Sequence, residues 1–192
     1  ERNLSIVGRI NSVTKMLTLM LGLPVIASMI MTVTVAGQYS RNNSLMSEIA
    51  ALKPVIETEI PEAVWTVVSG RATMEDSGVE ARIQEADQII ERVTAQTEEK
   101  RQLELIVARR TMNTLSQYVE QIGENLAKKR PVVENEEVLG EIRDVASLVG
   151  SMLNNYITES IEAGNRLVEW ITMVAYAGAA GELLLLLVAV IM

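Results

Sequence analysis

Two adjacent arginines, Arg109 and Arg110, are the residues whose type and spacing most favour binding chemistry. They lie in the stretch RRTMNTLSQYVEQ, and no acidic residue stands three or four positions from either of them. Side chains at those spacings are the ones that meet on the surface of a helix. The two guanidinium groups must therefore be balanced by water, another helix, a second subunit or a bound anion.

A ligand site is predicted at Arg109 and Asn113, together with Trp65 and Arg71 from the stretch IPEAVWTVVSGR. Arg109 flanks the apolar seam of its own helix, where a ligand or a neighbouring helix could reach it. The alternative interpretation of the arginines is a solvated helix surface. A small molecule or a solute-binding protein would be the partner at this site.

Arg110 belongs to a different side of the same predicted helix. An apolar patch with an arginine at its rim is typical of an interaction surface, so a dimer or helix interface is predicted there. The alternative is that a neighbouring helix of the same chain covers the patch. The apolar members lie just upstream: Leu103, Ile106 and Val107.

Composition excludes most catalytic chemistry. The chain has no histidine and no cysteine, which removes the commonest general base and the softest metal ligands. No glycine-rich phosphate loop or metal-ligand spacing occurs. A net charge of −8 and six aromatic residues (two Trp, four Tyr) argue against nucleic-acid binding. We expect no catalytic residues, no metal and no cofactor, and the chain by itself is not expected to be an enzyme.

Apolar residues gather in two long segments, 13–37 and 170–192, each of which holds one charged residue. About 20 apolar residues in a helix suffice to cross the hydrocarbon core of a bilayer. Both segments are therefore predicted to be transmembrane helices. The alternative, a pair of buried helices in a soluble protein, is disfavoured because a domain of this size can hardly enclose two such segments.

Basic residues near the beginning of the chain predict the orientation. Arg2, Arg9 and Lys15 precede or open the first span, and positive flanks stay in the cytoplasm. Residues 1–12 would be a cytoplasmic flank and residues 38–169 would lie outside the cytoplasm. The chain starts with Glu1 and stops inside a leucine run at Met192, so we expect a fragment whose parent continues into the cytoplasm.

The second predicted span contains one charged residue, Glu182. Glu182 is costly in lipid unless it faces a partner, and Gly178 and Gly181 next to it would permit close helix contact. Transmembrane packing is therefore predicted at these three residues.

Between the spans, apolar residues recur three and four positions apart, which predicts amphipathic helices, and strand signals are absent. A kink or the start of a new segment is expected at Pro54 and Pro61, and breaks are expected at 74–78, near 97–101 and at 127–137. One-sided helices must hide their apolar stripes against one another, so an all-α antiparallel four-helix bundle continuous with the two spans is predicted. The stripes are Leu45, Ile49, Leu52, Ile56, Ile60 and Val67; Val79, Ile83, Ala86, Ile90 and Val93; Leu105, Ala108, Met112, Leu115, Val119, Ile122 and Leu126; and Ile142, Ala146, Val149, Leu153, Tyr156, Ala163 and Leu167.

Three stretches resemble a known family: IPEAVWTVVSGR (60–71), RRTMNTLSQYVEQIG (109–123) and NEEVLGEIRDVASLV (135–149). They are similar to the extracytoplasmic sensor region of bacterial transmembrane sensor histidine kinases of the YesM/LytS type, and more broadly to chemoreceptor four-helix-bundle sensors. The resemblance implies a homodimer in the bacterial inner membrane. It also implies a cytoplasmic kinase part, outside this chain, that phosphorylates a response regulator.

The expected function is therefore transmembrane sensing. A ligand or binding protein would engage the extracytoplasmic domain, and the last helix would carry the change into the second span, with Gly150 and Gly164 as its soft points. Two alternatives stay open. One is the ligand-binding region of a methyl-accepting chemoreceptor, and the other is a membrane-anchored helical scaffold that does not sense.

Overall fold

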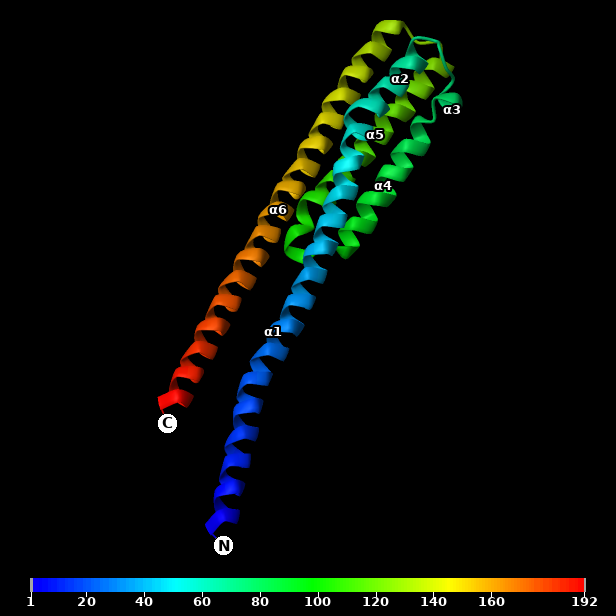
Figure 1. Ribbon diagram of the computed structural model, residues 1–192. Coiled ribbons are helices and arrows are strands. Elements are labelled where there is room, and N and C mark those ends of the chain that lie inside the picture. The colour runs from blue at the N-terminus through cyan, green and yellow to red at the C-terminus, as the bar shows by residue number, and fades with distance from the viewer. Residues whose placement is uncertain (1, 192) are drawn as a thin grey trace. The chain divides into compact units, whose positions relative to one another are not determined.

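The computed structural model describes residues 2–191, with side-chain surroundings mainly between residues 22 and 184. Glu1, Met192 and the side chains of Arg2 and Arg9, on which the predicted orientation depends, lie outside that description. Within the described residues the chain is helical almost throughout and has no strand, so the all-α prediction is confirmed (Figure 1). The elements are α1 (Arg2–Pro54), a π-helix (Val55–Glu59), α2 (Ile60–Val68), α3 (Met74–Ser77), α4 (Val79–Gln96), a 3₁₀ turn (Glu99–Arg101), α5 (Leu103–Ala127) and α6 (Val132–Ile191).

The prolines of the first stripe widen the helix instead of ending it. Pro61 has no N–H to donate to the carbonyl of Glu57, and its ring would collide with that carbonyl in a regular α-helix. The chain forms a π-turn at this place, in which the N–H of Ile60 bonds to the carbonyl of Val55. Because helical structure continues, Ile56 and Ile60 both stay in the core, with no exposed surface.

The break expected at residues 74–78 is a capped turn. Thr73 caps the short helix α3 by accepting a hydrogen bond from the N–H of Asp76 at 3.1 Å. Gly78 follows in the left-handed region, with φ of 64°, and α4 begins immediately after it. A residue without a Cβ is favoured in that conformation. The next break lies between Gln96 and Leu103, where the sequence also indicates one.

Residues 42–163 form one compact unit, here called the core unit. The predicted stripes of α1, α2, α4, α5 and α6 meet in a single hydrophobic core, in which the largest fully buried side chain is Tyr156. Every stripe residue within the core unit is buried, apart from Leu126 and Ala163, which are half-buried. The helical periodicity therefore identified the core correctly, because helices that pack on one side bury that side alone.

Gly150 of α6 is part of this packing. A Cβ at this position would overlap the carboxyl end of Glu57 in the π-helix, so the glycine lets the two segments approach closely. Glu57 is itself half-buried and lies 3.6 Å from the ammonium group of Lys53. The structure thus gives Gly150 a packing role, whereas the sequence suggested only a soft point in the last helix.

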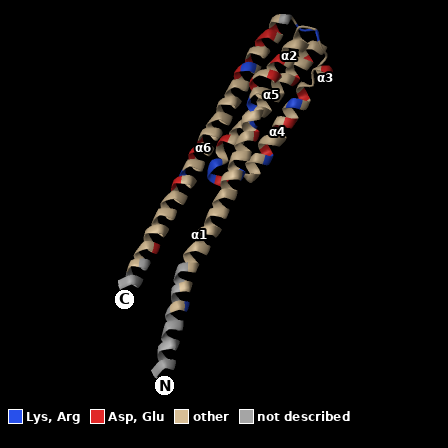
Figure 2. Ribbon diagram, in the orientation of Figure 1, with Lys and Arg blue, Asp and Glu red and all other residues tan. Residues whose placement is uncertain are grey.

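Residues 1–41 and 164–192 form a second unit, here called the apolar unit. Two described helices are long and apolar enough to cross a membrane, and the most apolar windows of these helices are 6% and 0% buried. A core helix of a soluble protein would be mostly covered by the rest of its own chain. Figure 2 shows the charged residues crowded along the core unit, while the described ribbon of the apolar unit carries few. Membrane association is supported at this coarse level.

Candidate functional site: the groove between α4 and α5

Arg109 is held by two carboxylates of the neighbouring helix α4. Its Nε donates to Oδ1 of Asp87 at 2.9 Å and one terminal nitrogen donates to Oδ2 at 3.0 Å, which is a bidentate pair. The other terminal nitrogen lies 3.0 Å from the Glu91 carboxylate. Among the possible partners of this arginine, the structure therefore selects another helix of the same chain.

Hydrogen bonding to Asp87 raises the pKa of Arg109 above its ordinary value, and Glu91 adds to the effect. About 39% of the Arg109 side chain is exposed, so solvent screens the pair and its contribution to stability is roughly 0.2–1 kcal/mol. All three guanidinium nitrogens already have partners, and an anion would have to compete with both carboxylates.

The ion pair lies in an open groove of about 510 Å³ between α4 and α5. Acidic side chains come from α4, and basic and amide side chains come mostly from α5, so the groove is polar and balanced in charge. A ligand there would find charges of both signs and a short apolar strip. The lining residues are Asp87, Glu91, Thr94, Ala95, Gln102, Ile106, Arg109, Arg110 and Asn113.

Asn113 connects this groove with a second one. The second groove, of about 370 Å³, continues along the same two helices toward Glu80 and Glu120, and it shares Asp87 and Asn113 with the first. Both residues therefore stand between two hollows on one face of the molecule. Arg110 lines the first groove with an exposed side chain.

The structure does not bring Trp65 and Arg71 to this groove. Trp65 lies on α2 with 40% of its surface exposed, and Arg71 lies in the turn that follows α2. The N–H of Arg71 bonds to the carbonyl of Thr66, which holds the turn together. Neither residue lines the described grooves between α4 and α5, so the four predicted ligand residues fall into two separate places.

The predicted interface patch is open to solvent within the described chain. Leu103 is 65% exposed and Ile106 is 37% exposed, and Val107 is half-buried. Ile106 and Arg110 also line the groove, so the predicted interface and the predicted ligand site are neighbours on α5. No other described helix of this chain covers Leu103.

Glu182 and its glycines lie on the part of α6 that belongs to the apolar unit. A Cβ on Gly178 or Gly181 would meet no described atom within 4 Å, and Glu182 is half-buried. Close helix packing at these glycines would therefore need a partner beyond the described residues of one chain.

Sequence reasoning missed the partners Asp87 and Glu91. They stand four positions apart, so on one helix they form a repelling pair that a cation from outside would relieve. That spacing was a usable signal, but the register between α4 and α5 was needed to connect it with Arg109. Within the described residues, no group of acidic side chains could hold a metal ion.

No protein-family model, no curated protein sequence and no solved structure matches this chain.

Proposed function

We propose that this chain is the signal-sensing region of a bacterial transmembrane receptor, of the kind found in two-component sensor histidine kinases. In this proposal the core unit lies outside the cytoplasm and detects a small molecule or a solute-binding protein. Residues 13–37 and 170–192 cross the inner membrane. In this proposal a cytoplasmic kinase part passes the signal to a response regulator.

One observation carries the proposal. Helix α1 and helix α6 each combine a buried stripe in the core unit with an apolar stretch that is long enough to cross a membrane and is not covered by the chain itself. The same helices therefore belong to a packed domain and to a membrane-type segment. A helix of this sort transmits a change in packing without an intervening flexible linker.

We further propose that the core unit is an antiparallel four-helix bundle. Its first leg would be α1 continued by the π-helix and α2, and its other legs would be α4, α5 and the first half of α6. Direct packing of α4 on α5 and of α2 on α4 supports this arrangement. A bundle of this kind offers ligand sites between its legs, and the groove beside Arg109 is such a place.

The topology can be tested directly because the chain has no cysteine. A single Gln117→Cys substitution on the exposed side of α5 should react, in intact cells, with a maleimide that cannot cross the inner membrane. A cysteine at Asn3, in the predicted cytoplasmic flank, should react only after the cells are opened. The reverse pattern would overturn the proposed orientation.

Sensing is tested with a chimeric receptor. Residues 1–192 would be joined to the cytoplasmic part of a reporter histidine kinase, and a thermal-shift screen with small anions, sugars and peptides would supply candidate ligands. A true ligand should change kinase output, and Asn113→Ala should weaken its thermal shift more than Arg71→Ala does. Ligand binding without any change of output in the chimera would favour a scaffold over a sensor.

A further inference from the structure

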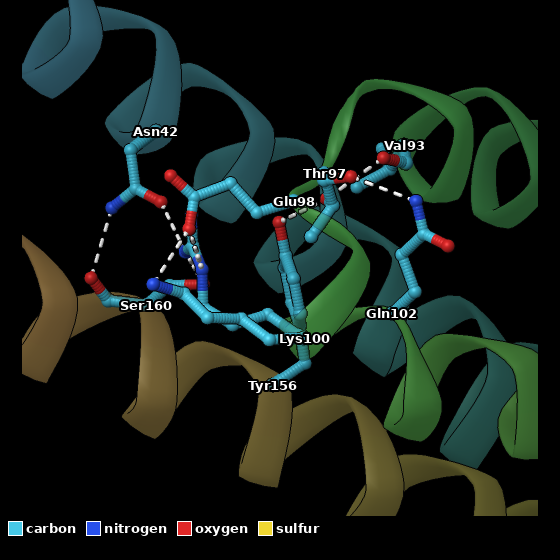
Figure 3. A network of polar contacts seen from close by, with 9 residues as sticks. Asn42, Val93, Thr97, Glu98, Lys100, Gln102, Tyr156 and Ser160 are labelled. Atoms are coloured by element: carbon cyan, nitrogen blue, oxygen red, sulfur yellow. Dashed lines mark hydrogen bonds and ion pairs between the residues drawn. The ribbon is translucent and has the colours of Figure 1, made fainter.

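A network of buried polar residues closes the end of the core unit that is next to the apolar unit in the sequence. Figure 3 shows its members converging from α1, from the turn between α4 and α5, and from α6. Three of them are almost inaccessible: Thr97 is 6% exposed, and Tyr156 and Ser160 are 0% exposed. Buried polar groups are uncommon in helical cores, and they specify one arrangement when their hydrogen bonds are satisfied.

Arg101 makes the contacts of this network to Asn42 and Ser160. It ends the 3₁₀ turn between α4 and α5, and its side chain is 14% exposed, whereas the side chain of Lys100 beside it is 78% exposed. One terminal nitrogen donates to Oδ1 of Asn42 at 2.7 Å and reaches Oγ of Ser160 at 3.4 Å. A single guanidinium group thus joins the turn to both α1 and α6.

Asn42 adds a direct link between the two terminal helices. Its Nδ2 donates to the backbone carbonyl of Ser160 at 2.9 Å, while its Oδ1 accepts from Arg101. Both ends of the amide are therefore used inside the protein. Asn42 is also the first residue of the tripeptide Asn42-Asn43-Ser44, which has the form of a glycosylation sequon. Here its side chain is used in hydrogen bonds within the protein.

The charge of Arg101 is held mainly by neutral oxygens. Its Nε has no hydrogen-bond partner among the described residues, and Oε2 of Glu98, on an exposed side chain, lies 3.8 Å away. A largely covered cation that is matched by neutral acceptors is stabilised less than one in a close ion pair. The geometry of the network is thus set by hydrogen bonds to Asn42 and Ser160, and its ion pair with Glu98 is long.

Gln102 connects the network with the groove beside Arg109. Its side chain lines that groove, and its Nε2 donates to the carbonyl of Thr97 at 2.8 Å. The hydroxyl group of Thr97 is in turn hydrogen-bonded to the hydroxyl group of Tyr156 on α6, at 3.1 Å. Thr97 thus joins the groove, through its backbone carbonyl, to a helix that continues into the apolar unit, through its hydroxyl group.

We infer that Asn42, Thr97, Arg101, Tyr156 and Ser160 form a releasable latch, through which the turn between α4 and α5 holds α1 against α6. A ligand that binds in the groove and hydrogen-bonds to the amide of Gln102, or that moves α4 along α5, weakens the hydrogen bond between Gln102 and Thr97. Loss of that hydrogen bond lets the turn move and carry Arg101 with it, so that within the latch only the hydrogen bond between Asn42 and Ser160 still joins α1 to α6. Arg101 acts as a positioning residue in this arrangement. Only the use of the latch in signalling rests on the proposed function.

The test measures distances between spin labels in the full chain in lipid nanodiscs. Because the chain lacks cysteine, label pairs can be placed at will. One pair, Ser44→Cys with Thr158→Cys, reports on α1 and α6 near the latch. A second pair, Glu62→Cys with Ser147→Cys, reports on α2 and α6 away from it. All four positions are exposed in the core unit.

The variant Arg101→Met should shift the distance of the near pair by roughly 1–2 Å or broaden its distribution clearly, and should leave the far pair unchanged. The matched control Lys100→Met should change neither pair. Tyr156→Phe and Gln102→Met, which remove hydrogen bonds with little change in size, should have a smaller effect of the same kind. Restoring the charge with Arg101→Lys should recover part of the parent distribution.

The latch is refuted if the near pair keeps its parent distribution in Arg101→Met, or if both pairs change equally, which would indicate general loosening. Should Arg101→Met lose its helical circular dichroism, Tyr156→Phe and Gln102→Met decide by the same criterion. The outcome is independent of the proposed function. The variants could change the near distance while the output of the chimeric receptor stays constant. That result would support the latch as a structural contact and refute its role in signalling.

Discussion

Gly150 of α6 and Glu57 of the π-helix lie so close together that a Cβ on the glycine would overlap the glutamate side chain. The π-turn that carries Glu57 exists because Pro61 forbids a regular helix at this place. Pro61 and Gly150, which are far apart in the sequence, thus contribute to the same packing contact.

Gly150→Ala should therefore displace the Glu57 side chain, and because that side chain is flexible and partly exposed, the loss of stability should stay below about 1 kcal/mol. Gly140→Ala on the same helix is the matched control. A Cβ at Gly140 meets nothing within 4 Å, and alanine should stabilise the helix there by up to about 1 kcal/mol. Denaturant unfolding of the full chain in detergent, followed by circular dichroism, measures both effects.

The double variant Glu57→Ala with Gly150→Ala checks the cause. Removing the glutamate side chain makes room for the methyl group, so the two substitutions should be clearly non-additive. Additive losses would contradict the close packing of these two residues.

Arg109→Ala should cost roughly 0.5–1 kcal/mol of stability, because Asp87 and Glu91 are left as an unrelieved pair of like charges on α4. The loss should shrink at high salt, which screens the exposed part of the interaction. Arg110→Ala on the same helix should change stability by less than about 0.5 kcal/mol. Urea unfolding at low and high salt gives these values, and equal losses for both arginines would contradict the pairing with Asp87.

Arg110→Glu and Leu103→Lys should reduce self-association if the exposed patch of α5 is a dimer interface. A charge of the opposite sign, or a lysine in place of an exposed leucine, disfavours burial against a second copy. Analytical ultracentrifugation of the full chain in detergent measures the monomer fraction, with Gln117→Glu on the exposed side of α5 as control. An unchanged monomer fraction in both variants would return the patch to an ordinary solvated surface.

A proline next to Ser160, as in Ile161→Pro, should uncouple the proposed receptor while ligand binding persists. Proline removes one helical hydrogen bond and kinks α6, which is otherwise helical from Val132 to Ile191. Ile161→Ala at this exposed position is the control and should signal normally. Kinase output and the ligand-induced thermal shift of the chimera are the two measurements, and normal output in the proline variant would disprove transmission through a rigid α6.

Periodicity in the sequence was sufficient for the helices, for the residues of the core and for the two membrane-type segments. These properties depend on the type of each residue and on its spacing along one chain. A stripe such as Leu105, Met112 and Leu115 is buried when that side of its helix packs against the rest of the protein. The turn at Gly78 could also be located, since local backbone chemistry decides it. The partner of Arg109 could not, because Asp87 is its neighbour only after α4 and α5 have taken a particular register.

The sequence by itself determined that this protein is helical, acidic, without cysteine or histidine, and apolar in two long segments. Only the tertiary structure decided which charges meet, that Gly150 lies against Glu57, and that Arg101 is largely covered while Lys100 next to it faces solvent. The physical reason is that burial and pairing depend on distances between elements. Those distances follow from how the side chains of several helices fill a common space, which the pattern of any single helix does not contain.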